Sequence, residues 1–349
     1  MQKKEIEDEK FTFVTCTYNH EKFIVLHLES IKFQVQHYFK GIKTYLIISD
    51  DGSSDSTLQL CKKWVDKNRD YFYEVLVLGD GMNRGTCKNY LRAVKFVKSN
   101  KFFFLAGDDL YGYRNLREIL EYLDYYDLIS APSLAFYEDE VTGYAIEMDY
   151  NKYKTNIANG VCHKFMRRAF TIAGCLLEAP PTVFRKELLD ERTSDFVGEY
   201  KLIEDQPMIY QFFKRNKVSM KYLDYSYIMY RINPNSVSHT KDKGIKTFAN
   251  NDIRKLCKYY LTHEKNIIYL YIAFLRMQII KGHSWVSFLL PTNHYLILMQ
   301  KLFNKNIKNI YCSAVKDTAL ENLKYLKIFD ENAKEFIEEL KETQRYEQI

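Results

Sequence analysis

Short apolar segments alternate with longer amphipathic segments along the first 130 residues of the chain. Four apolar runs, each short and rich in β-branched or aromatic side chains, read as buried strands. These runs are residues 11–16, 45–48, 75–78 and 102–106. Apolar side chains recur at helical spacing between them, and the strand starts lie 27 to 34 residues apart, which leaves room for right-handed βαβ crossovers. The pattern predicts a doubly wound α/β domain with a mostly parallel sheet.

The pattern changes further along the chain. From about residue 131 to 240 it is mixed, with a helix expected near 204–214 and a strand over 218–223, and we interpret this part as the rest of the same domain. From about residue 245 helical stretches follow one another with very little glycine, and breaks are expected at sites such as Pro291 and Asn304. We therefore expect one α/β domain over 1–240 and an α-helical C-terminal region over 241–349.

The distribution of charge is more informative than the net charge of +6. Residues 1–240 contain 33 basic and 33 acidic side chains, whereas residues 241–349 contain 18 basic and 12 acidic ones. This pattern argues against a nucleic-acid-binding protein and favours a local basic surface.

Seven scattered cysteines without a C-x-x-C pair favour a reducing compartment. Because the charged segment 1–10 lacks the apolar core of a signal peptide, we expect a cytoplasmic location.

Polar clusters follow all four predicted strands, at the edge where α/β sheets bind ligands. The clusters are Thr15-Cys16-Thr17-Tyr18-Asn19, Asp50-Asp51-Gly52-Ser53-Ser54-Asp55, Asn83-Arg84-Gly85 with Asn89, and Gly107-Asp108-Asp109. Each has a simpler reading, as a turn, a helix cap or a solvated acid pair. Together they favour Mg²⁺ or Mn²⁺ bound with substrate phosphates. Neither a P-loop nor a dinucleotide-binding glycine motif is present.

In order and spacing these clusters resemble the glycosyltransferase family 2 domain of GT-A fold. The resemblance covers about residues 9–240 and continues through Thr182-Val183-Phe184-Arg185-Lys186, Glu204-Asp205 and Tyr230-Arg231 with Ser236 and Ser238. It implies a Rossmann-like GT-A domain and an inverting hexosyltransferase. Such an enzyme moves a sugar from a nucleotide-sugar, expected to be a UDP-sugar, to a hydroxyl of a glycan or lipid-linked acceptor by single displacement.

The resemblance also assigns roles to individual residues. The nucleotide-sugar would contact Thr15, Thr17, Tyr18, Asn19, Asp51, Asn83, Gly85, Asn89, Asp108 and Arg231. Asp109, with Asp108, would bind the divalent metal, and Asp205 would be the catalytic base with Glu204 beside it. Many members have Asp-x-Asp-Asp at the metal strand, and Ala106 replaces the leading acid here. This departure leaves open which of the two remaining aspartates is the main ligand.

General chemistry agrees with these roles and leaves alternatives. A divalent cation neutralises the departing diphosphate, and a carboxylate takes the proton of the acceptor hydroxyl. Glu204 and Asp205 would also suit a helix N-terminus, and Arg231 could be a diphosphate clamp or a surface arginine. His239 is expected to be an ordinary loop histidine. A Gln-x-x-Arg-Trp motif is absent from the sequence, which disfavours a processive synthase. The alternative function is a non-catalytic nucleotide-sugar-binding or scaffold protein.

The C-terminal region lies outside the resemblance. Residues 253–312 contain nine Lys or Arg, one acid and ten aromatic side chains. Such a surface suits an anionic membrane presenting a lipid-linked acceptor. Its apolar face could instead pack on the catalytic domain or on a second copy in a homodimer. The composition, rich in Lys, Asn, Tyr and Ile, looks bacterial, and bacterial relatives build lipopolysaccharide or capsule. If the surface binds a membrane, the expected position is peripheral, on the inner face of the bacterial membrane; if it packs within or between chains, no such position follows.

Overall fold

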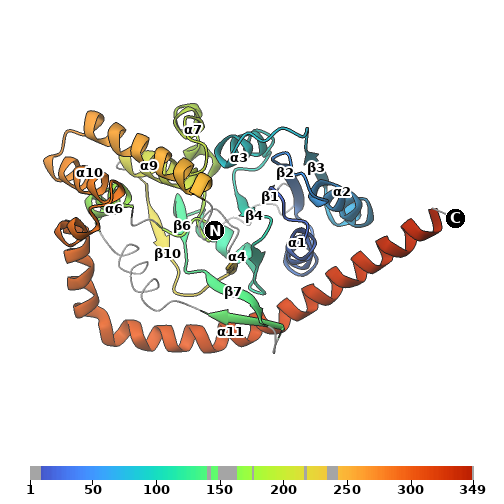
Figure 1. The fold of residues 1–349 in the computed structure, drawn as a ribbon. Coiled ribbons are helices and arrows are strands. Elements are labelled where there is room, and N and C mark those ends of the chain that lie inside the picture. Colours follow the sequence, from blue (N-terminus) through green and yellow to red (C-terminus); the bar gives the residue numbers. More distant parts are fainter. Residues whose placement is uncertain are drawn as a thin grey trace.

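The computed structural model describes residues 9–139, 143–147, 163–174, 177–215, 218–233 and 243–347. It contains a mixed α/β body followed by helices (Figure 1). Ser236, Ser238 and His239, which the sequence singles out, lie outside the described residues.

The four predicted strands form a central parallel sheet with the order β3-β2-β1-β4. They are β1 (Lys10–Thr17), β2 (Lys43–Asp50), β3 (Glu74–Leu78) and β4 (Phe102–Ala106). The register places Thr17 beside Asp50 and Cys16 beside Ala106, so three neighbouring strands end at the same edge. The prediction of a mostly parallel α/β sheet is therefore confirmed.

Helices cover both faces of this sheet, because alternate side chains of each strand point to opposite sides. The helices are α1 (Ile24–Tyr38), α2 (Thr57–Asn68) and α3 (Thr86–Val94). Phe13 and Leu46 belong to the hydrophobic core under α1 and α2, whereas Val14 and Ile47 belong to the core under α3. Both cores exclude solvent, which explains why the strands are apolar along their whole length.

Two smaller sheets complete the α/β body. One has the order β5-β11-β7-β8 and the other β10-β6-β9. Their strands are β5 (Leu110–Tyr111), β6 (Leu128–Ser130), β7 (Leu134–Asp139), β8 (Gly143–Glu147), β9 (Val183–Phe184), β10 (Met220–Tyr222) and β11 (Ile228–Arg231). The helices are α4 (Leu116–Tyr122), α6 (Lys164–Ala173), α7 (Glu191–Gly198) and α8 (Asp205–Lys214), with 3₁₀ turns η2 (Arg69–Tyr71) and η3 (Lys186–Leu188). Antiparallel pairing of β11 with β5 brings Arg231 back to the end of β4.

The C-terminal region is helical, as predicted. It consists of α9 (Lys243–His263), α10 (Ile267–Ile280), the 3₁₀ turn η4 (Ser284–Leu289) and α11 (Pro291–Glu347). Leu256, Tyr260 and Ile272 of α9 and α10 are buried in the core that also contains α3 and α8. None of the helices described here is both long and apolar enough to cross a membrane.

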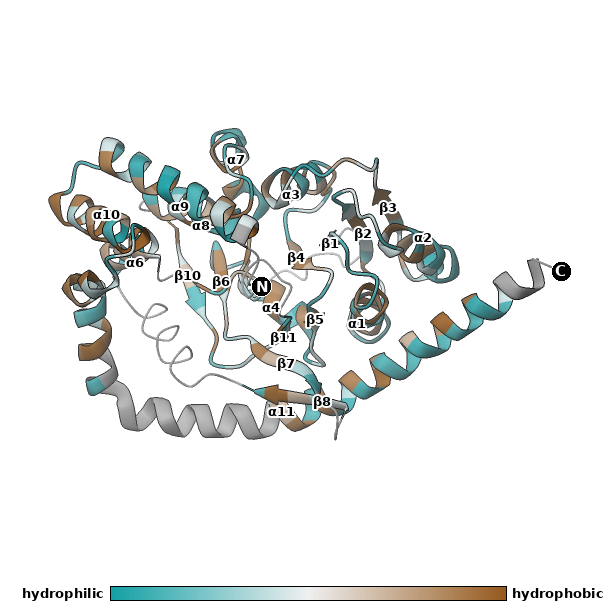
Figure 2. Cartoon of the chain, viewed as in Figure 1, coloured by the Kyte–Doolittle hydropathy of each residue, from teal (hydrophilic) through white to brown (hydrophobic). Residues whose placement is uncertain are grey.

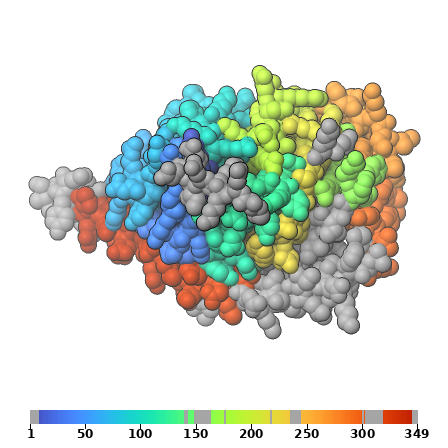
Figure 3. Space-filling view, turned by 180° about the vertical axis from the view of Figure 1, so that it is seen from behind, coloured from blue at the N-terminus to red at the C-terminus, as the bar shows by residue number. Residues whose placement is uncertain are grey.

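Helix α11 runs along one whole side of the molecule (Figures 1 and 3). It starts against η4 and α6, and its later turns pack on α1 and β8. Figure 3 shows its C-terminal end extending past the body on the side opposite α10. The break predicted at Asn304 is wrong, because this residue lies within α11. Asparagine is only a weak helix former, and neither glycine nor proline accompanies it there to end the helix.

Candidate functional site

The loops that follow β1 and β2 are joined at the carboxyl edge of the sheet. The Asn19 backbone N–H donates to Ser53 Oγ at 2.9 Å, and the Asn19 side-chain oxygen accepts from the Ser54 N–H at 2.8 Å. Asn19 has φ of 55°, a region that asparagine adopts more readily than most residues. Tyr18, beside it, is exposed. Two of the predicted clusters therefore meet, with Asn19 as the link.

Asp51 links the third cluster to the second. Its carboxylate accepts the backbone N–H groups of Arg84 at 2.8 Å and Gly85 at 2.9 Å. Burial raises the pKa of Asp51, and these two hydrogen bonds act in the opposite direction. Gly85 has φ of 83°, and a Cβ there would lie 2.8 Å from the Lys201 carbonyl oxygen. Glycine is therefore needed where this loop meets the segment that leads into Glu204.

Two buried polar atoms at this edge have no hydrogen-bond partner among the residues described: Thr17 Oγ1 and His20 Nδ1. Both face Gly107, where an added Cβ would lie 3.0 Å from the first and 3.1 Å from the second. His20 Nε2 is 3.9 Å from Asp108 Oδ2. Buried polar atoms are normally hydrogen-bonded, so these two keep an unused hydrogen-bonding capacity. Sequence reasoning missed His20, although it directly follows the Thr-Tyr-Asn cluster.

Asp109 is fixed from two sides. Its Oδ1 accepts the Arg231 backbone N–H at 2.9 Å, and its carbonyl oxygen lies 2.6 Å from His27 Nδ1. Because a carbonyl only accepts, His27 Nδ1 bears the proton, and Nε2 accepts from Thr15 Oγ1 at 2.8 Å. Burial lowers the pKa of His27 to about 4, so the ring is neutral. Thr15, predicted to contact the donor, is instead buried and supports Asp109 through His27.

Arg231 is buried, in contrast to a surface arginine. Its guanidinium lies between the rings of Phe23 and Phe136, 4.5 and 4.4 Å from their centroids. Its Nε donates to the Asp108 carbonyl oxygen at 2.9 Å, and Nη1 lies 3.5 Å from Glu138 Oε1. Burial lowers the pKa of Arg231, but arginine stays charged in proteins. The site therefore has a fixed positive charge beside the aspartate pair.

The aspartate pair after β4 fits a divalent cation only together with a ligand. The described part of the chain contains no cluster of three metal-ligating side chains. One oxygen of Asp109 accepts from Arg231, whereas the nearest ionic partner of the Asp108 carboxylate is His20 at 3.9 Å. Mg²⁺ usually takes one or two carboxylates and completes its shell with water and substrate phosphates. The donor set has this chemistry.

Glu204 and Asp205 lie together at the start of α8. Burial raises the pKa of both side chains, and the adjacent negative charge of Asp205 further raises that of Glu204, to about 8. With a pKa of about 8, Glu204 therefore keeps its proton at neutral pH. Burial raises the pKa of the Cys16 thiol at the end of β1, and the charges of Glu204 and Asp51 raise it further. The Glu204 carboxyl group is thus near the end of β1.

Helices of the C-terminal region hold these carboxylates in place. Asp252 of α9 accepts the backbone N–H groups of Lys201 and Leu202 at 2.9 and 2.8 Å. Arg276 of α10, which is buried, donates to the Gln206 side-chain oxygen, and its positive charge lowers the pKa of Asp205. Sequence reasoning missed Arg276, because it lies in an apolar stretch 71 residues after Asp205.

The two asparagines of the third cluster have different positions. Asn89 is buried, and its amide group bonds the Ser49 carbonyl oxygen at 2.9 Å and the Ser49 hydroxyl at 2.7 Å. It therefore connects α3 to β2. Asn83 is exposed on the loop before α3. A spacing of six residues cannot distinguish these two environments.

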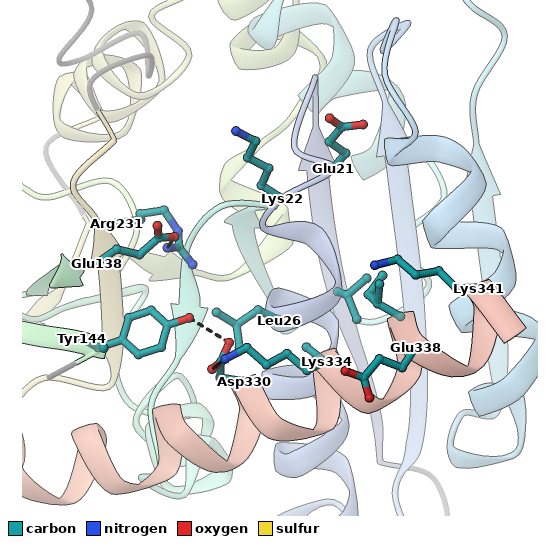
Figure 4. A pocket seen from close by; sticks show the side chains of 14 residues that line it. Glu21, Lys22, Leu26, Glu138, Tyr144, Arg231, Asp330, Lys334, Glu338 and Lys341 are labelled. Atoms are coloured by element: carbon teal, nitrogen blue, oxygen red, sulfur yellow. Dashed lines mark hydrogen bonds and ion pairs between the residues drawn. The ribbon is translucent and has the colours of Figure 1, made fainter. Parts of the chain in front are cut away.

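A groove of about 800 Å³ opens beside this edge, between α1 and α11 (Figure 4). Arg231 and Glu138 stand at one end, and Tyr144 donates to Asp330 of α11 across it at 2.9 Å. Its apolar lining consists of Val25, Leu26, Ala333 and Ile337. Of the predicted site residues, Arg231 alone lines this groove. The groove thus adjoins the aspartate pair without containing it.

The structure has a parallel sheet with acidic loops at its carboxyl edge, and a second sheet brings Arg231 back to these loops. This arrangement is a GT-A type of fold. The family model for glycosyl transferase family 2 matches residues 12–192, more than half of the chain. The chain therefore belongs to glycosyl transferase family 2. No curated protein sequence matches it.

Solved structures share this fold. S. aureus TarS 1–349 in complex with UDP-GlcNAc has a TM-score of 0.52 and 18% identity, covering 93% of this chain and 89% of that one. The mannosyltransferase PcManGT from Pyrobaculum calidifontis, in complex with GDP-Man and Mn²⁺, has a TM-score of 0.51 and 12% identity, covering 94% and 84%. A longer S. aureus TarS structure has a TM-score of 0.52 at 18% identity, and 79% of this chain aligns with 43% of it. This chain thus spans less than half of the longer TarS. At these identities the likeness establishes the fold.

Proposed function

We propose that this chain is an inverting, non-processive glycosyltransferase that moves a hexose from a nucleotide-sugar to an acceptor hydroxyl. The observation that supports this most is the meeting of polar loops at the carboxyl edge of the parallel sheet, where Asp51 follows β2 and Asp108 follows β4. Asp205 adjoins Glu204, whose charge raises the pKa of Cys16 at the end of β1. Thr17 and His20 present polar atoms at the same edge that have no hydrogen-bond partner among the described residues. A structural role alone would leave such atoms hydrogen-bonded within the protein.

The donor would bind over the ends of β1 and β2. Thr17, Tyr18 and Asn19 would line the nucleotide pocket with Asp51, and the loop of Asn83 and Gly85 would close it. The TarS complex with UDP-GlcNAc supports a UDP-sugar as the donor. Thr15 and Asn89 would act indirectly, by holding Asp109 and β2 in place.

The diphosphate would lie between Arg231 and the aspartate pair. Asp108, supported by Asp109, would hold Mn²⁺ or Mg²⁺ there, and the PcManGT complex with Mn²⁺ supports this choice. When bound, the cation neutralises charge on the departing diphosphate. Arg231 would add a fixed positive charge that needs no reorganisation during the reaction.

Asp205 would be the general base. As the acceptor oxygen attacks the anomeric carbon, Asp205 takes the hydroxyl proton, while the bond from that carbon to the diphosphate oxygen breaks. Glu204 would stay protonated beside it, so that one negative charge is available at neutral pH. Arg276, through Gln206, would keep Asp205 ionised.

The acceptor would approach along the groove that adjoins Arg231. Its mixed charged rim and apolar lining suit a glycan or a lipid-linked saccharide. Residues 1–240 would then form the catalytic domain, and the helices of 241–349 would position the base and border the acceptor. A cytoplasmic role in bacterial surface polysaccharide synthesis, of lipopolysaccharide or capsule, fits this chemistry.

Asp205→Asn tests the proposal. The amide keeps the shape of the carboxylate but cannot accept the proton, so transfer should fall roughly 10²–10⁴-fold while donor affinity is retained. Release of nucleoside diphosphate from a panel of nucleotide-sugars with Mn²⁺ and candidate acceptors measures this. Asp195→Asn, at an exposed position on α7, is the control. Turnover close to wild type in Asp205→Asn would remove the base assignment. Donor binding without turnover by the wild type would favour the non-catalytic alternative.

A further inference from the structure

The outer side of α10 and the two elements after it expose apolar side chains at one end of the molecule (Figure 2). On α10, Ile267, Tyr271 and Phe274 follow one another at spacings of four and three residues, so they share one face of the helix. On η4, Trp285 is 65% exposed and Phe288 59%. We call these side chains, together with Ile268 and with Ile297 and Leu298 of α11, the apolar patch.

Packing within the chain does not account for this patch. The opposite face of α10 is buried, with Tyr269, Ile272 and Leu275 in the hydrophobic core of the body. That face satisfies the prediction that an apolar helix side packs on the catalytic domain. The outer face contributes nothing to the core, although exposed apolar surface of this extent usually marks an interaction site.

The charged residues near the patch along the chain have one sign, although Arg276 among them is buried. Residues 265–316 contain seven Lys or Arg and neither Asp nor Glu. Lys265, Lys281 and Lys301 are exposed near the patch residues in sequence. The acid just before this segment, Glu264, is buried and accepts from Arg168 and Tyr210, so its charge does not offset the exposed lysines.

This charge pattern discriminates between the partners that could cover the patch. In a two-fold dimer the same surface meets itself, and the exposed lysines would face lysines. Anionic lipid headgroups complement them instead. Tryptophan and tyrosine are the side chains enriched at the membrane–water interface. We propose that the apolar patch attaches this protein to the surface of an anionic bilayer, with its aromatic side chains at headgroup depth and no segment crossing.

Vesicle binding tests the proposal, and it needs neither donor nor acceptor. The full chain is sedimented with phosphatidylcholine vesicles, with and without phosphatidylglycerol, at about 0.05 M and about 0.5 M salt, between which the screening length falls about threefold. Binding should require phosphatidylglycerol and weaken at high salt. Trp285→Ser combined with Phe288→Ser should reduce the vesicle partition coefficient at least tenfold. Lys265→Gln combined with Lys281→Gln should reduce it roughly 25-fold at low salt.

The matched controls are exposed residues elsewhere on the molecule. Tyr125→Ser, after α4, and Lys62→Gln, on α2, should leave vesicle binding unchanged. Unchanged melting temperatures show that the variants fold. Asp205→Asn should bind vesicles like the wild type, which separates this proposal from the proposed catalysis.

Three results would overturn the proposal. The first is no sedimentation with phosphatidylglycerol vesicles at low salt, and the second is equal binding to neutral and anionic vesicles. In the third, the wild type binds no vesicles and is a dimer in light scattering, and the variant with Trp285→Ser and Phe288→Ser is a monomer. That result would identify the apolar patch as a contact between two copies of the chain.

Discussion

Glu204→Gln measures the energetic consequence of burying two adjacent carboxyl groups at the start of α8. Burial, with the charge of Asp205, raises the pKa of Glu204 from 4.5 to about 8. The folded state therefore binds this proton more tightly than the unfolded state. Its contribution to stability is complete below about pH 4.5 and is lost as the pH rises through about 8.

The size of the effect follows from that pKa. A tenfold change in acidity corresponds to about 1.4 kcal/mol, so ionising Glu204 costs the folded state on the order of 5 kcal/mol. About 4 kcal/mol of this effect falls between pH 5 and pH 9. Glutamine keeps the size of the side chain and cannot ionise. The variant should thus resemble the wild type near pH 5 and be more stable at about pH 9, by an amount that approaches 4 kcal/mol.

Urea unfolding at about pH 5, 7 and 9 gives the free energy of unfolding of each protein. The exposed Glu121→Gln on α4 is the control, and its curve should run parallel to that of the wild type. If Glu204→Gln also runs parallel to the wild type over this range, Glu204 is already ionised in the folded protein. The assignment of the shared proton to Glu204, and with it the single charge on Asp205, would then be wrong.

Other substitutions test the remaining parts of the site and the fold. Asp108→Ala should abolish Mn²⁺-dependent donor binding, and Asp109→Ala should weaken it. Calorimetry measures this binding. Undiminished donor affinity of the wild type in excess EDTA would contradict the metal assignment. His20→Ala should lower donor affinity roughly tenfold with little change in melting temperature, because His20 Nδ1 has no hydrogen-bond partner to lose among the described residues. Unchanged affinity would exclude His20 from the donor site. Phe329 lies in the contact of α11 with α1, so Phe329→Ala should reduce the free energy of unfolding by about 3–5 kcal/mol in urea. Leu320 is exposed on α11, so the control Leu320→Ala should change it by less than about 0.5 kcal/mol.

The central sheet was predictable because both of its faces are buried. Each strand is then apolar throughout, and the polar residues that follow it mark the binding edge. The clusters after the strands could be found for that reason. Their internal geometry could not, since Thr15 and Asn89 share the residue types and spacing of donor-contacting positions yet point into the core.

Long-range packing was beyond sequence reasoning. Arg276 reaches Gln206 only because α10 folds back over α8. Nothing local distinguishes it from an arginine that ends an apolar run. The same holds for α11, in which a helical pattern at 320–340 indicates an apolar face but does not reveal that α1 is its partner.

The length of α11 has a consequence for how the chain acquires its structure during synthesis. Phe33 of α1 packs on Phe329 of α11 with ring centroids 5.4 Å apart, although the two are about 300 residues apart along the chain. At roughly 5–20 residues per second, a ribosome needs about 15–60 s to add the residues between them. Throughout that time the outer face of α1 exposes aromatic surface to solvent. Newly made chains are therefore most exposed to chaperones and to aggregation at α1, the helix that follows the first strand of the sheet.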